Sequence, residues 1–307
     1  MDLRRHLKRT FEQGVLWSGI PGAMRRRHRG DVLVLAYHNI VPNGAATGGD
    51  RSLHLPQQRF AEQLDALLRT HDIIPLASAL EGYAGDRPAA VITFDDAYEG
   101  AVTVGIAELE ARRLPATIFV APSFLNGGAF WWDALTEPGA SALSPALRSW
   151  ALDDCAGRDA DIRARAPREH GAQPSPLPTH ARGAHEHDLR SAAALPGITL
   201  GSHTWSHPNL SRLDGDALER ELVQPLAWLR ERFSNVLAAI SYPYGLASPV
   251  VERAAASAGY TAGLCIEGGW MSRADGGANA FALPRLDVPS GLSAAGFELR
   301  AAGVRVR

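Results

Sequence analysis

The chain has 307 residues, 46% of them hydrophobic, which is enough to bury the core of one large α/β domain or two small domains. Its net charge is −2, with a pI near 6.6, so it lacks the strongly basic surface that nucleic-acid binding normally requires. The two cysteines, Cys155 and Cys265, lie far apart without the spacing of a thiolate metal site or a disulfide framework. We therefore expect a globular protein with ordinary thiols and no nucleic-acid partner.

Residues 1–30 predict a basic, amphipathic helical arm. Leu3, Leu7, Phe11 and Val15 recur every four residues among arginines and lysines. Such a helix either docks on a membrane surface or covers the bottom of the domain with a solvated basic face. The arm has neither the continuous apolar stretch nor the cleavage site of a signal peptide. We therefore expect a cytoplasmic protein, with any membrane association at the inner face.

The next part of the chain alternates between strand and helix patterns. The nearly unbroken apolar run at 31–40 predicts a strand buried on both faces of a parallel sheet. Helical spacing over 55–71 and a second apolar run at 89–96 complete a β-α-β unit. Residues 101–114 and 115–122 then read as another helix and another strand.

The same alternation resumes after residue 196. We expect strands at 197–203, 236–245, 261–266 and 281–288, with helices at 213–233 and 248–260 between them. This order predicts a right-handed α/β barrel or a doubly wound sheet. In such folds the active site gathers at the C-terminal ends of the strands.

Residues 137–196 interrupt the alternation. They are rich in Ala, Arg, Pro and His and have little apolar periodicity. A stretch of this length within a domain predicts an insertion, partly helical and partly disordered, that lies outside the core. We therefore expect a helical arm at 1–30, a barrel at 31–290 that carries this insertion, and a C-terminal tail at 291–307.

The side chains that suggest chemistry all follow predicted strands. Asp95 and Asp96 are adjacent carboxylates that repel each other unless a cation is near. His203 and His207 stand four apart, a spacing that lets both imidazoles face one point. Two imidazoles and one carboxylate suit Zn²⁺ or another borderline divalent ion, with open positions for water and substrate. The alternative is a solvated turn in which an aspartate caps the following helix.

Three motifs together resemble a known family. The segments TFDDA at 93–97, SHTWSHP at 202–208 and YPYG at 242–245 look like the first three motifs of the polysaccharide deacetylases, which are carbohydrate esterase family four with the nodulation-type (NodB) homology domain. The resemblance covers about residues 31–288. It implies a distorted (β/α) barrel of seven or eight strands and a metal-dependent hydrolase that removes acetyl groups from glycans.

The resemblance also implies a role for each motif residue. Asp95 matches the catalytic base, while Asp96, His203 and His207 match the ligands of a divalent metal. Zinc is the expected ion, with Co²⁺, Ni²⁺ and Fe²⁺ as alternatives. Tyr244 matches the residue whose backbone N–H helps to hold the oxyanion, so it also contacts the substrate.

The sequence departs from the family pattern at three places. Ala97 replaces a usual glycine, and Ser241 replaces an arginine that in many members pairs with the catalytic aspartate. Arg285 is our candidate for that missing cation. No histidine follows His207, so the C-terminal motif with a catalytic histidine is absent. His38 closes the first buried strand and is our candidate general acid, unless its role is only structural.

Two tryptophans follow the third predicted strand. Trp131 and Trp132 either stack on a sugar ring or anchor their loop into the core, and Trp270 is a weaker candidate of the same kind. The leading hypothesis is a metal-dependent deacetylase that acts on the amide bond of an N-acetylated saccharide or glycan precursor. The alternatives are a hydrolase of another carboxamide or ester and a glycan-binding module that has lost catalysis.

Overall fold

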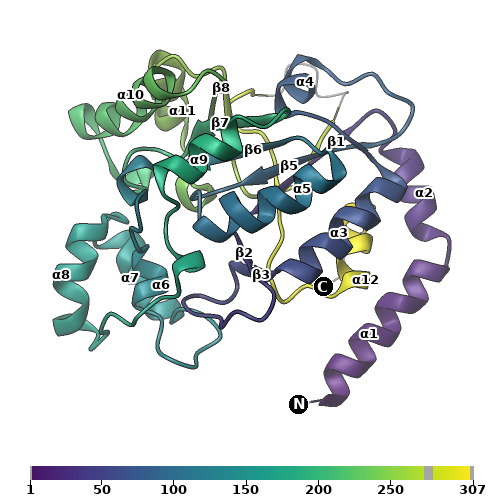
Figure 1. Cartoon of the computed structure of the whole chain (residues 1–307), viewed down its shortest axis with the longest axis horizontal. Coiled ribbons are helices and arrows are strands. Elements are labelled where there is room, and N and C mark those ends of the chain that lie inside the picture. The colour runs from purple at the N-terminus through teal and green to yellow at the C-terminus, as the bar shows by residue number, and fades with distance from the viewer. Residues whose placement is uncertain (1, 273–278, 305–307) are drawn as a thin grey trace.

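A strongly curled, mostly parallel sheet forms the centre of the computed structural model, which describes residues 2–272 and 279–304, with side chains from residue 7 onward (Figure 1). The order of the strands is β10, β1, β5, β6, β7, β8, β9, and only β10 is antiparallel to its neighbour. The α/β distorted barrel predicted from the sequence is thus confirmed. Its strands are β1 (Val32–Tyr37), β5 (Ala89–Phe94), β6 (Ala116–Val120), β7 (Ile198–Ser202), β8 (Val236–Ser241), β9 (Ala262–Leu264) and β10 (Trp270–Met271).

The apolar runs of the sequence form strands because both of their faces are covered. Every residue of β1, β5 and β6 is buried. β1 and β5 pair in register from Val32 opposite Ala89 to Tyr37 opposite Phe94. Their carboxyl ends therefore meet at the same edge of the sheet, where the residues that follow each strand become neighbours.

A short segment at 283–287 spans the gap between β9 and β1. Leu283 forms a bridge to Leu264 of β9. β11 (Leu286–Asp287) then pairs with Leu35 and Ala36 of β1. This closure carries the side chain of Arg285 into the barrel, where it is fully buried.

Amphipathic helices cover the outside of the sheet. In α3 (Gln57–Thr70), Phe60, Leu64 and Leu67 are buried at the spacing that the sequence predicted. Further helical elements are α4 (Leu76–Glu81), the π-helical turn Ala101–Gly105, α5 (Ile106–Arg112), α10 (Gly215–Arg232) and α11 (Pro249–Ser257). β4 (Asp72–Ile73) extends the central sheet beside β5, and β2 (Asn39–Val41) and β3 (His54–Pro56) form a separate two-stranded sheet. Short 3₁₀ turns lie at Pro122–Phe124, Thr179–Ala181, Leu210–Arg212 and Pro243–Gly245.

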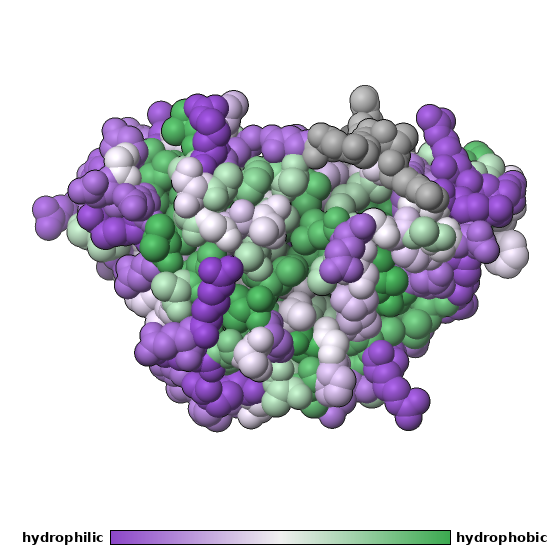
Figure 2. Space-filling view, turned by 90° about the horizontal axis from the view of Figure 1, so that it is seen from above, coloured by the Kyte–Doolittle hydropathy of each residue, from purple (hydrophilic) through white to green (hydrophobic). Residues whose placement is uncertain are grey.

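The molecular surface mixes polar and apolar groups, as is normal for a folded domain. Seen from above the view of Figure 1, hydrophilic side chains project along the rim and apolar residues lie between them (Figure 2). Among the described residues, no helix is both long enough and apolar enough to span a bilayer.

The segment expected as an insertion is partly helical, as predicted, but it does not lie outside the core. After α6 (Trp131–Ala134) it forms α7 (Pro145–Asp153), α8 (Asp159–Glu169) and α9 (Glu186–Ala193). Their inner faces join the same apolar cluster as the strands, through Leu147, Ala151, Ile162, Ala166 and Leu189. Because two of these contacts are alanines, the apolar periodicity of the sequence was too weak to predict the packing.

Helices from both ends of the chain lie side by side. α1 (Asp2–Trp17) and α2 (Ile20–Arg27) form the N-terminal arm, and α1 packs against α12 (Ala294–Ala301). α12 also contacts α3 and buries Phe297 and Leu299. The segment expected as a tail at 291–307 therefore contains a packed helix, and its residues 305–307 lie outside the described part of the chain. The domain boundaries themselves stay a prediction.

Candidate active site

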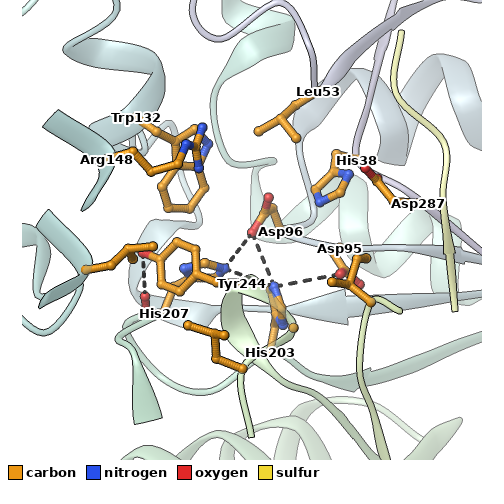
Figure 3. Close-up of a pocket in the computed structure, with 14 residues that line it drawn as sticks. His38, Leu53, Asp95, Asp96, Trp132, Arg148, His203, His207, Tyr244 and Asp287 are labelled. Carbon is orange, nitrogen blue, oxygen red and sulfur yellow. Dashed lines mark hydrogen bonds and ion pairs between the residues drawn. The ribbon is translucent and has the colours of Figure 1, made fainter. Parts of the chain in front are cut away.

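A cavity of about 310 Å³ opens where the strands end (Figure 3). This volume lies at the lower end of the range of small-molecule sites. Its polar lining includes the strand-end residues that the sequence singled out, namely His38, Asp95, Asp96, His203 and His207. Its apolar lining comes from Leu53, Leu152, Leu246 and Ile266.

Three buried side chains converge on one point of this cavity. The Nε2 atoms of His203 and His207 are 3.0 Å apart. Oδ1 of Asp96 lies 3.5 Å from the first of these nitrogens and 3.4 Å from the second. A ligand atom from each residue lies within 4.8 Å of the others, so the group has the geometry to hold a metal ion.

Neighbouring groups orient this set. Nδ1–H of His203 donates to the Ser241 carbonyl over 2.7 Å, which leaves the lone pair of Nε2 directed at Asp96. The hydroxyl of Thr204 accepts the backbone N–H of His207 over 3.0 Å and braces the loop between the histidines. The backbone of the chain thus presents the ligand atoms before any ion arrives.

The charge states of the three groups suit a cation. Burial lowers the pKa of His203 to about 4 and also lowers that of His207, so both imidazoles are neutral at pH 7. Burial raises the pKa of Asp96, and the nearby Asp95 and Asp133 raise it further. Among the described residues, Oδ1 of Asp96 has no hydrogen-bond partner. A divalent ion would supply the charge and the partner that this carboxylate lacks, so the residues fit such an ion.

Asp95 faces a different partner. Arg285 donates from Nη1 to Oδ1 and from Nη2 to Oδ2, each over 2.7 Å, and Ser241 Oγ donates to Oδ2 over 3.1 Å. Burial raises the pKa of Asp95, but the charge and hydrogen bonds of Arg285 outweigh it and hold the pKa well below its usual range. Asp95 is therefore ionised. Ser241 Oγ accepts another hydrogen bond from Arg285, over 2.7 Å, and its small side chain leaves room for this arginine, which directly precedes β11.

Strained backbone is concentrated in the three motifs. Asp96, Ala97, Thr204, His207 and Tyr244 have φ values of 70°, 52°, 65°, 57° and 59°, and they are five of the eight non-glycine residues with positive φ in the described chain. Each costs about 1 kcal/mol for an L-residue, so packing must hold it, as is common at functional sites. The alanine that replaces the family's usual glycine thus stands at a position where glycine would be unstrained.

His38 reaches the same cavity as the proposed ligands. It is half-buried, and Figure 3 shows it on the side of Asp96 away from Tyr244, next to Asp287. Sequence reasoning missed Asp287. It stands in β11, opposite Ala36 of β1, and the same strand-end argument that selected His38 would have found it.

Of the two adjacent tryptophans, only Trp132 lines the cavity. Its ring centroid is 4.7 Å from that of His207, and its Nε1–H donates to the Tyr98 hydroxyl over 2.9 Å. Trp131 is buried and donates its Nε1–H to the Tyr244 hydroxyl over 3.1 Å. Trp131 therefore anchors the loop, whereas Trp132 forms part of the cavity wall.

The position of Trp270 contradicts the prediction that it binds substrate. It lies in β10, which is antiparallel and pairs Trp270 with Leu33, near the start of β1. Its ring stacks on His28 with centroids 4.1 Å apart. Since the cavity lies at the other end of β1, Trp270 packs the arm against the barrel and does not reach the site.

Two further polar features were missed by sequence reasoning. Arg148 of α7 lines the cavity, and its Nη2 donates to Oδ2 of the buried Asp50 over 2.6 Å. Asp133 is fully buried and accepts hydrogen bonds from the Tyr98 hydroxyl and from His54 Nε2, over 2.5 Å and 2.8 Å. Through Tyr98 this carboxylate fixes Trp132. Neither residue lies in a motif or at the end of a predicted strand, so no feature of the sequence identified them.

A family model described as polysaccharide deacetylase matches residues 82–263, more than half of the chain. The matched region contains all three motifs, with Asp95, Asp96, His203 and His207, whereas His38 and Asp287 of the cavity lie outside it. No curated protein sequence matches the chain.

Several solved structures share the fold. The deacetylase PplD of Streptococcus pyogenes, solved in complex with acetate, is 18% identical with a TM-score of 0.56, over 87% of this chain and 96% of that one. A polysaccharide deacetylase from Bacillus cereus is 14% identical with a TM-score of 0.62, over 89% and 69%. IcaB from Ammonifex degensii is 15% identical with a TM-score of 0.60, over 89% and 98%.

Proposed function

Because the chain belongs to the polysaccharide deacetylase family, we propose that it is a metal-dependent hydrolase that removes the acetyl group from an N-acetylated saccharide or glycan precursor. The observation that carries this proposal is the convergence of Asp96, His203 and His207 in one cavity, next to the ionised Asp95. A ligand set for the ion and a separate carboxylate base are two of the parts that metal-assisted hydrolysis of an amide uses.

Asp96, His203 and His207 would hold the ion, and Zn²⁺ is the proposed metal because two imidazoles and a carboxylate suit it. When bound, such an ion supplies a Lewis acid that polarises the acyl oxygen and lowers the pKa of a water molecule. Co²⁺, Ni²⁺ and Fe²⁺ are compatible with the same donors.

Asp95 takes the proton of the attacking water in this proposal. Its carboxylate is held ionised by Arg285 and is fixed in orientation by that bidentate contact. The guanidinium then acts as a positioning group, because it touches the base and not the substrate. The backbone N–H of Tyr244 is proposed to stabilise the oxyanion together with the ion.

His38 is the proposed general acid that protonates the leaving nitrogen. It lines the cavity with Asp287 beside it (Figure 3). A carboxylate near an imidazole can accept a ring N–H and fix the orientation of the ring. Asp287 is therefore proposed as a positioning residue for His38.

The substrate would enter the cavity that Trp132, Tyr244 and Arg148 line. The ring of Trp132 packs against Phe130 and His207, so it would form an apolar wall of the cavity for the C–H groups of a sugar. The guanidinium of Arg148, held by Asp50, offers further donors to the hydroxyl groups of a saccharide.

The alternative of an inactive glycan-binding module is less favoured, because Asp95 keeps a cationic partner in place of the family's usual arginine.

The direct test is the release of acetate from a panel of N-acetylated sugars, O-acetylated sugars and simple acetate esters. The full chain is assayed with Zn²⁺, after chelation, and after metal is restored. The proposal requires metal-dependent release from an N-acetylated sugar. Release from esters alone would favour another hydrolase on this fold, and saccharide binding without any release would favour the inactive module.

His207→Ala is expected to remove most of the bound metal, because it deletes one of three protein ligands. Elemental analysis of the native chain should give about one divalent ion per chain, and the variant should hold a small fraction of that and lose hydrolysis. His187→Ala is the matched control, since that imidazole is exposed in α9, outside the cavity. Full occupancy in the His207 variant would rule out the proposed site.

His38→Ala is expected to slow the hydrolysis of an amide about a hundredfold, the usual scale of general acid catalysis, with a much smaller effect on an activated ester. The difference arises because an activated ester has a leaving group that needs little protonation. The measurement compares kcat on an N-acetylated sugar and on a nitrophenyl acetate. Equal losses on both substrates would assign His38 a structural role.

A further inference from the structure

The N-terminal helix exposes three of its large apolar side chains to solvent, although Val15 and Leu16 are half-buried. The exposed fractions are 58% for Leu7, 63% for Phe11 and 87% for Trp17, and 48% for Ile20 at the start of α2. These four are half of the eight exposed large hydrophobic residues in the described chain. We call them the apolar stripe. A helix that merely covers the domain would turn such side chains inward, so the stripe needs another explanation.

The orientation of α1 is fixed by its opposite face. Glu12 is only 1% exposed, and its Oε2 accepts a hydrogen bond from Ser293 Oγ over 2.5 Å. Ser293 is the N-terminal cap of α12, where an acidic side chain is favoured by the helix dipole. Turning the apolar stripe inward would break this contact and bury basic side chains in its place. In Figure 1, α1 runs along the outside of the molecule with its N-terminal end directed away from the body.

Charge is distributed unevenly between this arm and the rest of the chain. Residues 1–30 contain eight Lys and Arg against two Asp and Glu, a net charge of +6. Since the whole chain carries −2, the remaining residues carry −8. Lys8, Arg26 and Arg27 are exposed next to the apolar stripe, whereas Glu12 is buried. The exposed side of the arm is therefore both apolar and cationic.

We propose that α1 and α2 dock the protein on an anionic lipid surface. Exposed Trp, Phe and Leu beside Lys and Arg on one helix are the pattern of helices that lie in the membrane interface. Anionic headgroups complement the +6 charge of the arm, while the body, at −8, is repelled and stays in solution. Pairing of this face with the same face of a second copy would bring two such charges together and is disfavoured.

The test is co-sedimentation of the full chain with vesicles. One set is pure phosphatidylcholine, and the other contains about a third phosphatidylglycerol, a fraction chosen to give a strongly negative surface. Phe11→Ser with Trp17→Ser removes apolar area, and Lys8→Glu with Arg26→Glu reverses charge. Leu68→Ser with Val250→Ser is the matched control, because both residues are exposed hydrophobics outside the arm, 41% and 58% exposed. All of these side chains are solvent-exposed, and melting curves check that each variant is folded.

The native chain and the control pair are expected to bind only the anionic vesicles, less tightly as salt is raised. Each pair of arm substitutions is expected to weaken binding at least about tenfold. Equal binding by the native chain and the arm variants would overturn the proposal, as would binding to neither vesicle. Sedimentation analysis without lipid tests one more outcome. If the native chain is a dimer and the arm substitutions dissociate it, the apolar stripe binds a second copy of the chain, and the proposal is overturned. None of these readouts depends on hydrolysis.

Discussion

Asp95→Asn is expected to keep the metal ion and to lose hydrolysis by a factor of at least about a hundred, whereas Asp96→Asn should lose both. The structure separates the two carboxylates. Asp96 Oδ1 lies 3.5 Å and 3.4 Å from the two imidazole nitrogens. The closer oxygen of Asp95 lies 4.0 Å from His203 Nε2 and is already occupied by Arg285. An amide in place of Asp95 therefore removes a base, and an amide in place of Asp96 removes an anionic ligand.

The measurement is metal content by elemental analysis, together with acetate release at saturating metal. Asp65→Asn serves as the control, because that carboxylate is paired with Arg112 on the surface, far from the cavity in the fold. Equal metal content in the two cavity variants would show that the proposed division between base and ligand is wrong. Retained hydrolysis in Asp95→Asn would show that another group accepts the proton.

The strands whose ends carry the site could be predicted from the sequence, because such strands have local sequence patterns. Continuous apolar runs are specific for strands buried in a parallel sheet, and the structure places β1, β5, β7 and β8 where such runs were found. The carboxyl ends of parallel strands share one edge. Residues directly after those runs, such as His38 and Asp96, were therefore expected to share the cavity, and they do.

Contacts made by residues far apart in the sequence were harder to predict. Arg285 was selected only because Ser241 stands where the resemblance expects an arginine that pairs with the catalytic aspartate, and the structure shows Arg285 paired with Asp95. No departure from the family motifs indicated Arg148, which reaches the cavity from a helix of the insertion. The error at Trp270 has a related cause. An antiparallel strand reverses which end of the sheet its residues approach, and a sequence pattern of two residues does not reveal strand direction.

Removal of the Arg285 guanidinium is expected to destabilise the fold and to slow hydrolysis. Arg285→Met should lower the free energy of unfolding by about 3–5 kcal/mol, because it leaves Asp95 buried and charged without its partner. Without the guanidinium, the largest opposition to burial is lost and the pKa of Asp95 rises, so the acid limb of the pH–rate profile should move to higher pH. Melting curves in denaturant and pH–rate profiles measure the two effects.

A thermodynamic cycle with Asp95→Asn separates this pair from the rest of the Arg285 environment. Arg285 also donates to the Cys265 carbonyl over 2.8 Å, and that loss is the same with either residue at position 95. In the Asp95→Asn background, Arg285→Met should lower the free energy of unfolding much less, since no buried charge is left unpaired.

The sign of the pH dependence follows from the depressed pKa of Asp95. Its stabilising contribution is present above the unfolded-state pKa of about 3.9 and is lost as the pH falls, so the difference between native chain and Arg285→Met should be largest at neutral pH and should shrink in acid. If the loss of unfolding free energy caused by Arg285→Met is the same at every pH and with either residue at position 95, Arg285 stabilises the closure between β9 and β1 and does not act by pairing with the charge of Asp95.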